Sequence, residues 1–323
     1  METRTLGRTD LVVTPLGLGL AALGRPGYIN LDHAADLGHD RSVDGMEAHA
    51  HAVLDAAWAA DIRYFDAARS YGRAEAFLSS WLRTRAIAPE SVTVGSKWGY
   101  TYTAGWQVDA GVHEVKEHSL AVLQRQVAES RELLAPYLKL YQIHSATLES
   151  GVLANRAVLD ELARLRDGGL AIGLSLSGPR QGETLAHALE IEIGGQPLFA
   201  AVQATWNLLE PSAGHVLAAA HAAGMGVIVK EALANGRLTP RNQDPSFAAQ
   251  RRLLEAAAAS VGVTIDALAL AAVLHQPWAT VVLSGAATAE QVRSNVAALD
   301  VPWIPDLAAA LAALAETPAA YWA

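Results

Sequence analysis

The chain has 323 residues, of which 51% are hydrophobic and 18% are charged, and its formal net charge is −9. This composition excludes disorder over most of the chain, since enough apolar surface exists for a large core, and the acidic balance excludes a global basic footprint for nucleic acid. Cysteine is absent, which excludes disulfides, thiol nucleophiles and thiolate metal sites and fits a reducing compartment.

No membrane or export segment is expected. The opening Met1-Glu2-Thr3-Arg4-Thr5 contains no apolar run of the kind found in a signal peptide. Alanine-rich stretches such as residues 307–315 are short and amphipathic, whereas about 20 apolar residues are needed to cross a bilayer. We therefore expect a cytoplasmic protein.

Short apolar runs recur along the whole chain, each followed by a longer helical pattern. A hairpin is expected first, over residues 5–13, with its turn at Gly7-Arg8-Thr9-Asp10. The runs are apolar nearly throughout, as in parallel strands that are buried on both faces. They predict eight strands, at residues 13–20, 62–66, 92–96, 138–144, 171–175, 200–204, 226–229 and 281–284.

Helical periodicity fills the intervals between these runs. The last helix opens with the capping box Thr288-x-x-Gln291. The predicted helices span residues 46–60, 74–85, 113–134, 155–167, 182–190, 212–223, 246–261, 264–274 and 288–299. This alternation predicts a (β/α)8 TIM barrel of the α/β class with an N-terminal β-hairpin, formed by residues 1–323 as a single domain. An open doubly wound sheet is the alternative, but no Gly-x-Gly-x-x-Gly turn follows any of the strands.

The longest irregular stretches, residues 24–45 and 98–112, follow strands and should lie at the carboxyl face of the barrel. The first contains polar residues that favour a solvated substrate loop over a metal site: Tyr28, Asn30, His33, Asp36, His39 and Asp40. The second contains aromatic residues that suit sugar or ring substrates or a small loop core: Trp98, Tyr100, Tyr102 and Trp106. We predict no metal ligands.

Four chemically related side chains follow three consecutive predicted strands. Asp66 ends the second strand and Tyr71 follows it, Lys97 stands at the end of the third, and His144 ends the fourth, so a barrel would bring them to one mouth. An ion pair with Asp66 would keep Lys97 charged, and its ammonium would lower the phenol pKa of Tyr71 from about 10 towards neutrality. Such a phenol can exchange a proton with a carbonyl oxygen, and His144 can orient that oxygen by a hydrogen bond.

At these positions the sequence resembles the aldo-keto reductase family, from about Arg4 to about Leu299. The resemblance is carried by Arg4-Thr5-Leu6-Gly7-Arg8-Thr9-Asp10-Leu11, Pro15-Leu16-Gly17-Leu18-Gly19, Phe65-Asp66-Ala67-Ala68-Arg69-Ser70-Tyr71-Gly72, Gly95-Ser96-Lys97 and Gln142-Ile143-His144. It implies a barrel that binds a nicotinamide cofactor without a Rossmann domain. It also implies that Tyr71 is the general acid/base, that Asp66 and Lys97 tune it, and that His144 orients the substrate.

The resemblance extends to the nicotinamide contacts. Gln203 matches the residue that contacts the carboxamide, and Trp206 matches the aromatic that stacks on the ring. Ser175 matches a serine that touches the carboxamide, while the next residue, usually Asn in the family, is Leu176 here.

Two later segments resemble the rest of the cofactor site. The loop after the seventh strand resembles the pyrophosphate loop, in which backbone N–H groups and Arg237 would offset the diphosphate charge. The residues assigned to it are Leu233, Asn235, Gly236, Arg237 and Leu238. The segment after the last strand resembles the adenosine end, with Ser284, Gly285, Ala286, Gln291 and Asn295.

The resemblance favours NADP(H) and leaves NAD(H) open. Family members that are strong in NADP often carry a Lys after the last strand and an Arg further on, where this chain has Gly285 and Gln291. The preference for the 2′-phosphate is therefore open.

The resulting hypothesis is an NAD(P)(H)-dependent oxidoreductase that acts on an aldehyde, ketone or sugar lactol. Two other hypotheses stay open: a cofactor-binding regulatory subunit of the same fold without physiological turnover, and a phosphate-binding barrel lyase or isomerase. The expected partner is a small carbonyl or sugar molecule, with no nucleic acid and no membrane, and the oligomeric state is open.

Overall fold

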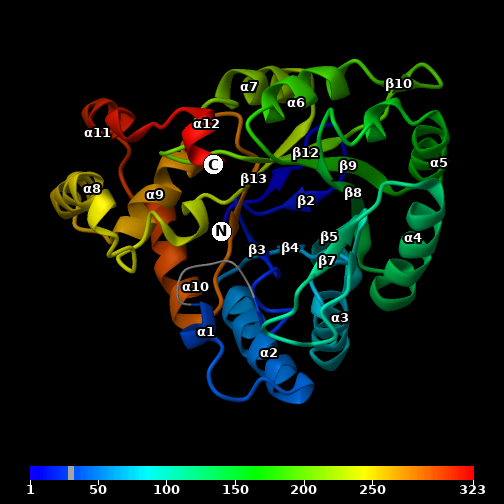
Figure 1. Cartoon of the computed structure of the whole chain (residues 1–323), viewed down its shortest axis with the longest axis horizontal. Coiled ribbons are helices and arrows are strands. Elements are labelled where there is room, and N and C mark those ends of the chain that lie inside the picture. The colour runs from blue at the N-terminus through cyan, green and yellow to red at the C-terminus, as the bar shows by residue number, and fades with distance from the viewer. Residues whose placement is uncertain (28–32) are drawn as a thin grey trace.

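The computed structural model describes residues 1–27 and 33–323, and its centre is a closed barrel of eight parallel strands (Figure 1). The strands follow one another in chain order, each paired with the next, and the last closes on the first. They are β3 (Leu16–Gly19), β4 (Tyr64–Asp66), β5 (Thr93–Trp98), β8 (Leu138–Ala146), β9 (Ala171–Leu176), β12 (Ala201–Thr205), β13 (Gly226–Lys230) and β14 (Val281–Ser284). The predicted (β/α)8 barrel is confirmed, with strand bounds that differ by a few residues.

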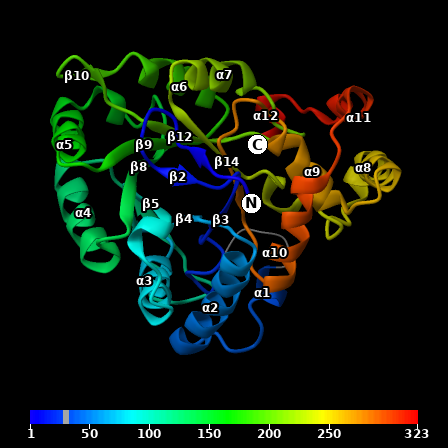
Figure 2. The ribbon, with the colours of Figure 1, turned by 180° about the vertical axis from the view of Figure 1, so that it is seen from behind.

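Helices surround the barrel, as Figures 1 and 2 show from opposite sides. They are α1 (His33–Asp36), α2 (Val43–Ala59), α3 (Ala74–Thr84), α4 (Leu120–Leu134), α5 (Arg156–Asp167), α6 (Gln181–Leu189), α7 (Gly214–Ala222), α8 (Ala248–Ser260), α9 (Ile265–Leu274), α10 (Ala289–Val296), α11 (Pro305–Leu311) and α12 (Pro318–Tyr321). Single 3-10 turns occupy Pro89–Ser91, Val152–Ala154, Ala234–Gly236, Pro245–Phe247, Ala297–Asp300 and Ala312–Leu314. The apolar faces of these helices pack on the outside of the strands and form the larger core.

Side-chain caps set the start of several helices. Thr288 accepts a hydrogen bond from the backbone N–H of Gln291 at 3.1 Å, as its sequence predicts. The Gln291 side chain accepts instead from the N–H of Ala287 at 2.7 Å. Both contacts satisfy backbone donors that would otherwise be left open at the helix end.

The N-terminal hairpin closes the amino end of the barrel. Its strands β1 (Arg4–Thr5) and β2 (Val12–Val13) pair antiparallel. Arg8 donates to the carbonyls of Ala223 (2.9 Å) and Phe199 (2.6 Å), just before β13 and β12 begin. The hairpin side chains Leu6 and Val13 join the inward-facing side chains of the strands in a second core: Tyr64, Leu140, Ala201, Ile228, Val281 and Leu283.

The structure corrects two predicted elements. The run over residues 13–20 is divided, because Pro15 has no N–H to donate to a ladder; β2 belongs to the hairpin and β3 to the barrel. The helix predicted over residues 113–134 begins at Leu120, where the Ser119 hydroxyl caps the N–H of Val122. The residues before it form β7 (Glu114–Lys116), which pairs with β6 (Tyr100–Tyr102) in a hairpin inside the stretch predicted to be irregular.

A smaller hairpin, β10 (Glu192–Ile193) with β11 (Gln196–Pro197), precedes β12. By length and composition, no single helix in the described part of the chain can cross a membrane, and the bent pair Pro245–Ser260 with Ile265–Leu274 meets these criteria only when the two are taken together.

The contact between the hairpin turn and β13 makes a testable prediction about stability. Gly7 has φ +56°, and a Cβ there would lie 2.3 Å from the backbone nitrogen of Gly226. Gly105 has the same φ of +56° but nothing within 4 Å of its Cβ position. We expect Gly105→Ala to lower the free energy of unfolding by about 1 kcal/mol, and Gly7→Ala by about 3 kcal/mol or more, since it also adds a backbone clash.

Urea unfolding of both variants measures this difference. Equal losses would show that the hairpin turn does not need its close contact with β13.

Candidate active site

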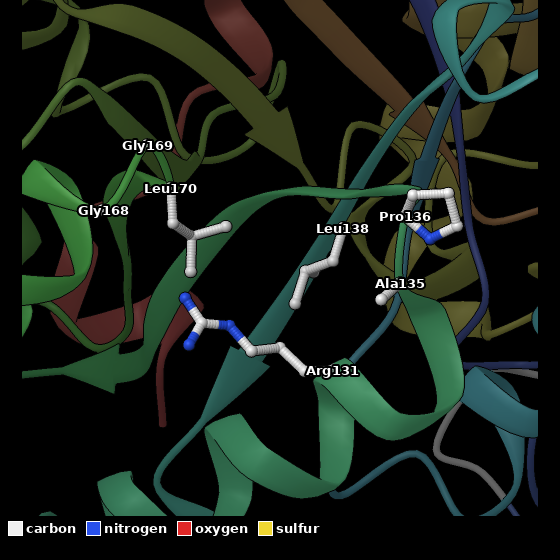
Figure 3. A pocket seen from close by; sticks show the side chains of 7 residues that line it. All are labelled: Arg131, Ala135, Pro136, Leu138, Gly168, Gly169 and Leu170. Carbon is white, nitrogen blue, oxygen red and sulfur yellow. The ribbon is translucent and has the colours of Figure 1, made fainter.

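One large pocket opens at the carboxyl ends of the strands. Its volume is about 720 Å³, and its walls include Gly19, Asp66, Ser175 and Ser284, which lie at or next to the ends of four barrel strands, and Gln203 in the middle of β12. A second cavity of about 200 Å³ lies at the opposite end, beside the start of β8 and the residue before β9 (Figure 3). Of these two cavities, only the first is lined by predicted site residues.

A buried ion pair stands at the base of this pocket. The Lys97 ammonium contacts the Asp66 carboxylate, and both side chains are almost wholly buried. The ammonium also donates to the Ala67 carbonyl at 3.1 Å and to the Tyr71 hydroxyl at 3.4 Å. The predicted meeting of Asp66, Tyr71 and Lys97 is therefore seen in the structure, although their catalytic roles stay a prediction.

The other oxygen of Asp66 accepts three hydrogen bonds inside the barrel. The donors are the Gln203 amide at 2.9 Å, and the Tyr64 hydroxyl and the Gln142 amide at 3.3 Å each. These groups replace the water that the carboxylate lost on burial. As a result β4, β5, β8 and β12 are joined by one polar network across the barrel.

The expectation of a lowered pKa for Tyr71 is wrong for this structure. Burial raises the pKa of the Tyr71 phenol well above its ordinary value, and the nearby Asp66 carboxylate raises it further, while Arg25 opposes the rise. Burial also lowers the pKa of Lys97, against the attraction of Asp66. The sequence argument included the Asp66–Lys97 pair, but it did not include the burial of the phenol or the effect of the Asp66 charge on it. At neutral pH the phenol is protonated.

His144 lies at the other side of the phenol and is neutral. Its ring centroid is 5.5 Å from that of Tyr71 and 4.9 Å from that of Tyr100. Burial, and then the charge of Lys97, lower the pKa of His144 well below its ordinary value. The Ser70 hydroxyl lies 3.4 Å from Nδ1; when it donates there, the ring proton is on Nε2. His144 can then act as a hydrogen-bond donor, as predicted.

The loop that carries Tyr71 is held by a close backbone contact. Tyr71 follows β4 by five residues, and the N–H of Arg73 donates to the Gly24 carbonyl at 2.7 Å. A Cβ at Gly24 would lie 2.1 Å from the Tyr71 carbonyl oxygen. A glycine is thus needed for the loop after β3 to support the segment that presents the phenol.

The predicted contacts for a carboxamide lie on the pocket wall. Gln203 and Ser175 line the pocket from adjacent strands and are buried. The Ser175 hydroxyl accepts from the N–H of Ser145 at 2.9 Å. An amide and a hydroxyl so placed can both donate to and accept from a primary amide.

Trp206 does not line the pocket, and its stacking on nicotinamide stays a prediction. Its ring packs edge-on against Trp278 with centroids 5.5 Å apart, and its indole N–H donates to the Pro211 carbonyl at 3.1 Å. The residue follows the end of β12 by one position and turns into the core between barrel and helices. The sequence could not show the packing partner, which lies 72 residues away.

The predicted pyrophosphate loop divides into two groups. Leu233, Asn235 and Gly236 line the pocket, with Asn235 and Gly236 in the left-handed region at φ +53° and +96°. Arg237 does not line it, because its guanidinium forms a two-pronged ion pair with Glu316, with one N–O distance of 3.1 Å. Leu238 is fully buried in the core. Neither Arg237 nor Leu238 lines the pocket, and their part in pyrophosphate binding stays a prediction.

The predicted adenosine residues all line the pocket: Ser284, Gly285, Ala286, Gln291 and Asn295. The Asn295 amide donates to the Ser284 hydroxyl at 2.8 Å, which joins α10 to the end of β14. The Gln291 amide donates to the Asp36 carboxylate at 3.1 Å.

Several charged side chains of the pocket were not predicted as site residues. They are Arg25, Asp36, Glu114, Lys230, Glu231, Asp266, Glu290 and Arg241. Lys230 is the last residue of β13, just as Lys97 lies near the end of β5. A search for polar residues at the carboxyl ends of the predicted strands would therefore have found Lys230 as well. Arg25 and Glu114 come from a loop and a small hairpin, where no strand-end position identifies them.

No group of three or more metal-ligating side chains is found among the described residues. Of the loop residues considered for a metal or a substrate, Tyr28 and Asn30 lie outside the described residues. Asp36 lines the pocket.

The chain is similar to proteins of one family along nearly its whole length. The model of the Aldo/keto reductase family matches residues 15–316. A pyridoxal 4-dehydrogenase from Microbacterium luteolum is 27% identical, and the match covers 91% of this chain and 92% of that protein.

Solved structures share the fold. The aldo-keto reductase AKR11C1 from Bacillus halodurans, in its holo form, matches with a TM-score of 0.75 at 20% identity, over 98% of this chain and 97% of that one. A protein of Pseudomonas aeruginosa assigned to the same family matches with a TM-score of 0.64 at 26% identity, over 92% and 94%.

The buried ion pair makes a prediction about stability. Lys97→Met leaves the Asp66 carboxylate buried without its cation, so we expect the free energy of unfolding to fall by about 3–5 kcal/mol. Adding Asp66→Asn removes that charge, and the double variant should be more stable than Lys97→Met alone. Chemical denaturation measures the free energy of unfolding of the wild type, of Lys97→Met, of Asp66→Asn and of the double variant.

Arg156→Met serves as the control, because it breaks an exposed pair with Asp160 on α5, and such pairs contribute about 0–1 kcal/mol. Additive losses in the double variant would contradict the coupling of the two buried charges.

Proposed function

Because the chain belongs to the aldo/keto reductase family, we propose that it is a nicotinamide-dependent oxidoreductase that interconverts an aldehyde, ketone or sugar lactol with its reduced partner, with Tyr71 as the general acid/base. The observation that carries this proposal is the contact of the Tyr71 hydroxyl with Lys97, at 3.4 Å, in the pocket that His144 also lines. Carbonyl reduction requires a proton donor and a second hydrogen-bonding group that both reach the carbonyl oxygen.

The residues of the pocket fit a nicotinamide dinucleotide. Gln203 and Ser175 offer donors and acceptors for a carboxamide, and Ser284 and Asn295 line the same pocket from β14 and α10. A glycine stands at residue 285, where an added Cβ would have nothing within 4 Å, so this end is open for a ring. The reduced cofactor, when bound, supplies the hydride.

In the reducing direction, the chain delivers a proton to the carbonyl oxygen. Tyr71 is protonated at neutral pH, because its pKa is raised by burial and by Asp66. His144 is neutral, and when the Ser70 hydroxyl donates to its Nδ1, its Nε2–H donates a hydrogen bond to the same oxygen and orients it. As the phenol releases its proton, Lys97, at 3.4 Å, stabilises the phenolate that forms.

In the oxidising direction, Tyr71 must first lose its proton. A raised pKa means that the phenolate forms only as the pH rises, so the oxidation rate increases with pH into the alkaline range. The reduction rate does not gain from alkaline pH, since the donor is then lost.

The similarity to the pyridoxal 4-dehydrogenase from Microbacterium luteolum suggests one aldehyde for the substrate panel. Pyridoxal, which the name of the Microbacterium luteolum protein contains, is a pyridine aldehyde that carries hydroxyl groups. Tyr100, whose ring lies 4.9 Å from that of His144, is an aromatic surface beside the predicted reaction centre. We propose pyridoxal as one substrate candidate, next to aldoses.

The charges around the adenosine end favour NAD(H), although the family resemblance favours NADP(H). Asp36, Asp266 and Glu290 line this end of the pocket, and Asp36 accepts from Gln291 at 3.1 Å. Arg241 is the one cation that lines this end within residues 1–27 and 33–323, and Asp36 pairs with it at 2.5 and 2.6 Å. A 2′-phosphate would meet an excess of negative charge here, so we propose NAD(H) as the preferred form.

Replacement of the phenol tests the proposed function. We expect Tyr71→Phe to lower kcat for carbonyl reduction by about a hundredfold or more, because the proton donor is lost, while the Kd of the cofactor stays within a few fold. Stopped-flow turnover and a fluorescence titration measure the two quantities.

The wild-type chain, assayed in both directions on a panel of aldehydes, ketones and aldoses, is the reference. Turnover by Tyr71→Phe at a rate close to that of the wild type would refute Tyr71 as the acid/base. If the wild type binds the cofactor tightly but turns over no substrate, the hypothesis of a regulatory subunit is favoured. If it does not bind the cofactor at all, the hypothesis of a lyase or isomerase is favoured.

The proposed cofactor preference rests on Asp36. We expect the wild type to bind NADH more tightly than NADPH, and Asp36→Asn to raise the affinity for NADPH relative to NADH by about tenfold, or ~1.4 kcal/mol, since a repelling charge is removed. Calorimetric Kd values for both cofactors measure this, with Asp160→Asn on α5 as the matched control. A ratio that is unchanged in Asp36→Asn would exclude Asp36 as the selecting residue.

A further inference from the structure

An ion pair that the proposed reaction does not use forms one wall of the pocket. Arg25 comes from the loop after β3 and Glu114 from β7, and their charged groups lie 3.0 Å apart. Both line the pocket, with side-chain exposures of 10% and 30%. A nearly buried guanidinium in a ligand pocket loses much of its hydration, so its partners matter.

The pair lies next to the predicted reaction centre. The Arg25 guanidinium carbon is 5.8 Å from the centroid of the Tyr71 ring, and the guanidinium donates to the Ser70 carbonyl at 3.4 Å. A carbonyl compound bound at Tyr71 would therefore extend its neighbouring carbons past this pair.

The small hairpin that carries Glu114 does not depend on this pair for its attachment. Lys116 donates to the Ser145 carbonyl at 2.7 Å, and a ring nitrogen of His118 lies 2.9 Å from the His144 carbonyl oxygen. The hairpin is thus fastened to the end of β8 by two contacts outside the pair. An ion pair that is partly or largely buried is in itself weak support for stability, which points to a role towards the ligand.

The chemistry of the pair suits a hydroxyl group. A guanidinium only donates hydrogen bonds and a carboxylate only accepts them, whereas a hydroxyl does both. A methyl group against the pair would remove water without replacing its hydrogen bonds. A phosphate or carboxylate group would approach Glu114 as a like charge.

A second pair makes the pocket electrically balanced near Tyr71. Lys230 and Glu231 line the same pocket with charged groups 2.8 Å apart. Glu231 has φ +56°, a conformation that costs a non-glycine residue free energy and that is concentrated at functional sites. Together with Lys97 and Asp66, these pairs place three cations and three anions around the pocket near Tyr71, so neither a cationic nor an anionic group gains a net attraction.

We propose that the Arg25–Glu114 pair selects the substrate, and that it favours an uncharged carbonyl compound with a hydroxyl group next to the carbonyl over its deoxy and phosphorylated analogues. This inference rests on the proposed function, and it assigns to Arg25 and Glu114 a specificity that no catalytic role requires.

Three aldehydes of the same chain length test it: glyceraldehyde, propanal and glyceraldehyde 3-phosphate. We expect the wild type to reduce glyceraldehyde with the highest kcat/KM. Arg25→Met should lower the ratio of kcat/KM for glyceraldehyde to that for propanal by about tenfold or more, and Arg25→Lys should keep part of it. Glu114→Gln should raise the ratio for glyceraldehyde 3-phosphate to glyceraldehyde by about tenfold.

Ratios measured on one sample do not depend on the folded fraction, so a merely structural role would leave them unchanged. Arg156→Met, on the outer helix α5, is the control and should alter neither ratio. Unchanged ratios in Arg25→Met and Glu114→Gln would overturn this inference while the proposed function stands. A wild type that reduces no carbonyl compound at all would overturn the proposed function and this inference with it.

Discussion

The site depends on the buried ion pair between Lys97 and Asp66. Burying two charges inside a barrel has a large desolvation cost, which is offset only when each charge is paired and its other bonds are made. Here Asp66 accepts from Tyr64, Gln142 and Gln203, while Lys97 donates to Ala67 and Tyr71. The same bonds that satisfy the pair hold four strands and the phenol in place.

Closure at one end of the barrel decides where chemistry takes place. The hairpin β1–β2 fills the amino end with Leu6 and Val13, so the interior there is a packed core. The carboxyl end is left open, and long loops after β3, β5 and β13 build its walls. Charged side chains from these loops line the pocket in pairs, and we infer that they choose between ligands that the proposed chemistry of the phenol alone would accept.

The prediction from sequence succeeded where strand position decides the outcome. Asp66, Lys97 and His144 lie within strands, and parallel strands in a barrel must bring their carboxyl ends together. It did not foresee the partners of Trp206 and Arg237, which follow strands and contact Trp278 and Glu316. Both partners lie more than 70 residues further along the chain, and no local pattern identifies them. The predicted lowering of the Tyr71 pKa was wrong for a related reason, because the burial that raises this pKa is a property of the folded chain.

The sequence by itself determined the eight strands, the helices between them, the hairpin and the order in which polar groups reach the barrel mouth, because hydrophobic periodicity and turn residues act locally. Tertiary structure alone decided which of those groups face the pocket, which are held by ion pairs elsewhere, and whether the phenol keeps its proton at neutral pH. These outcomes depend on distances between segments far apart in the chain and on the loss of water around them, and neither quantity is a property of any short stretch of residues.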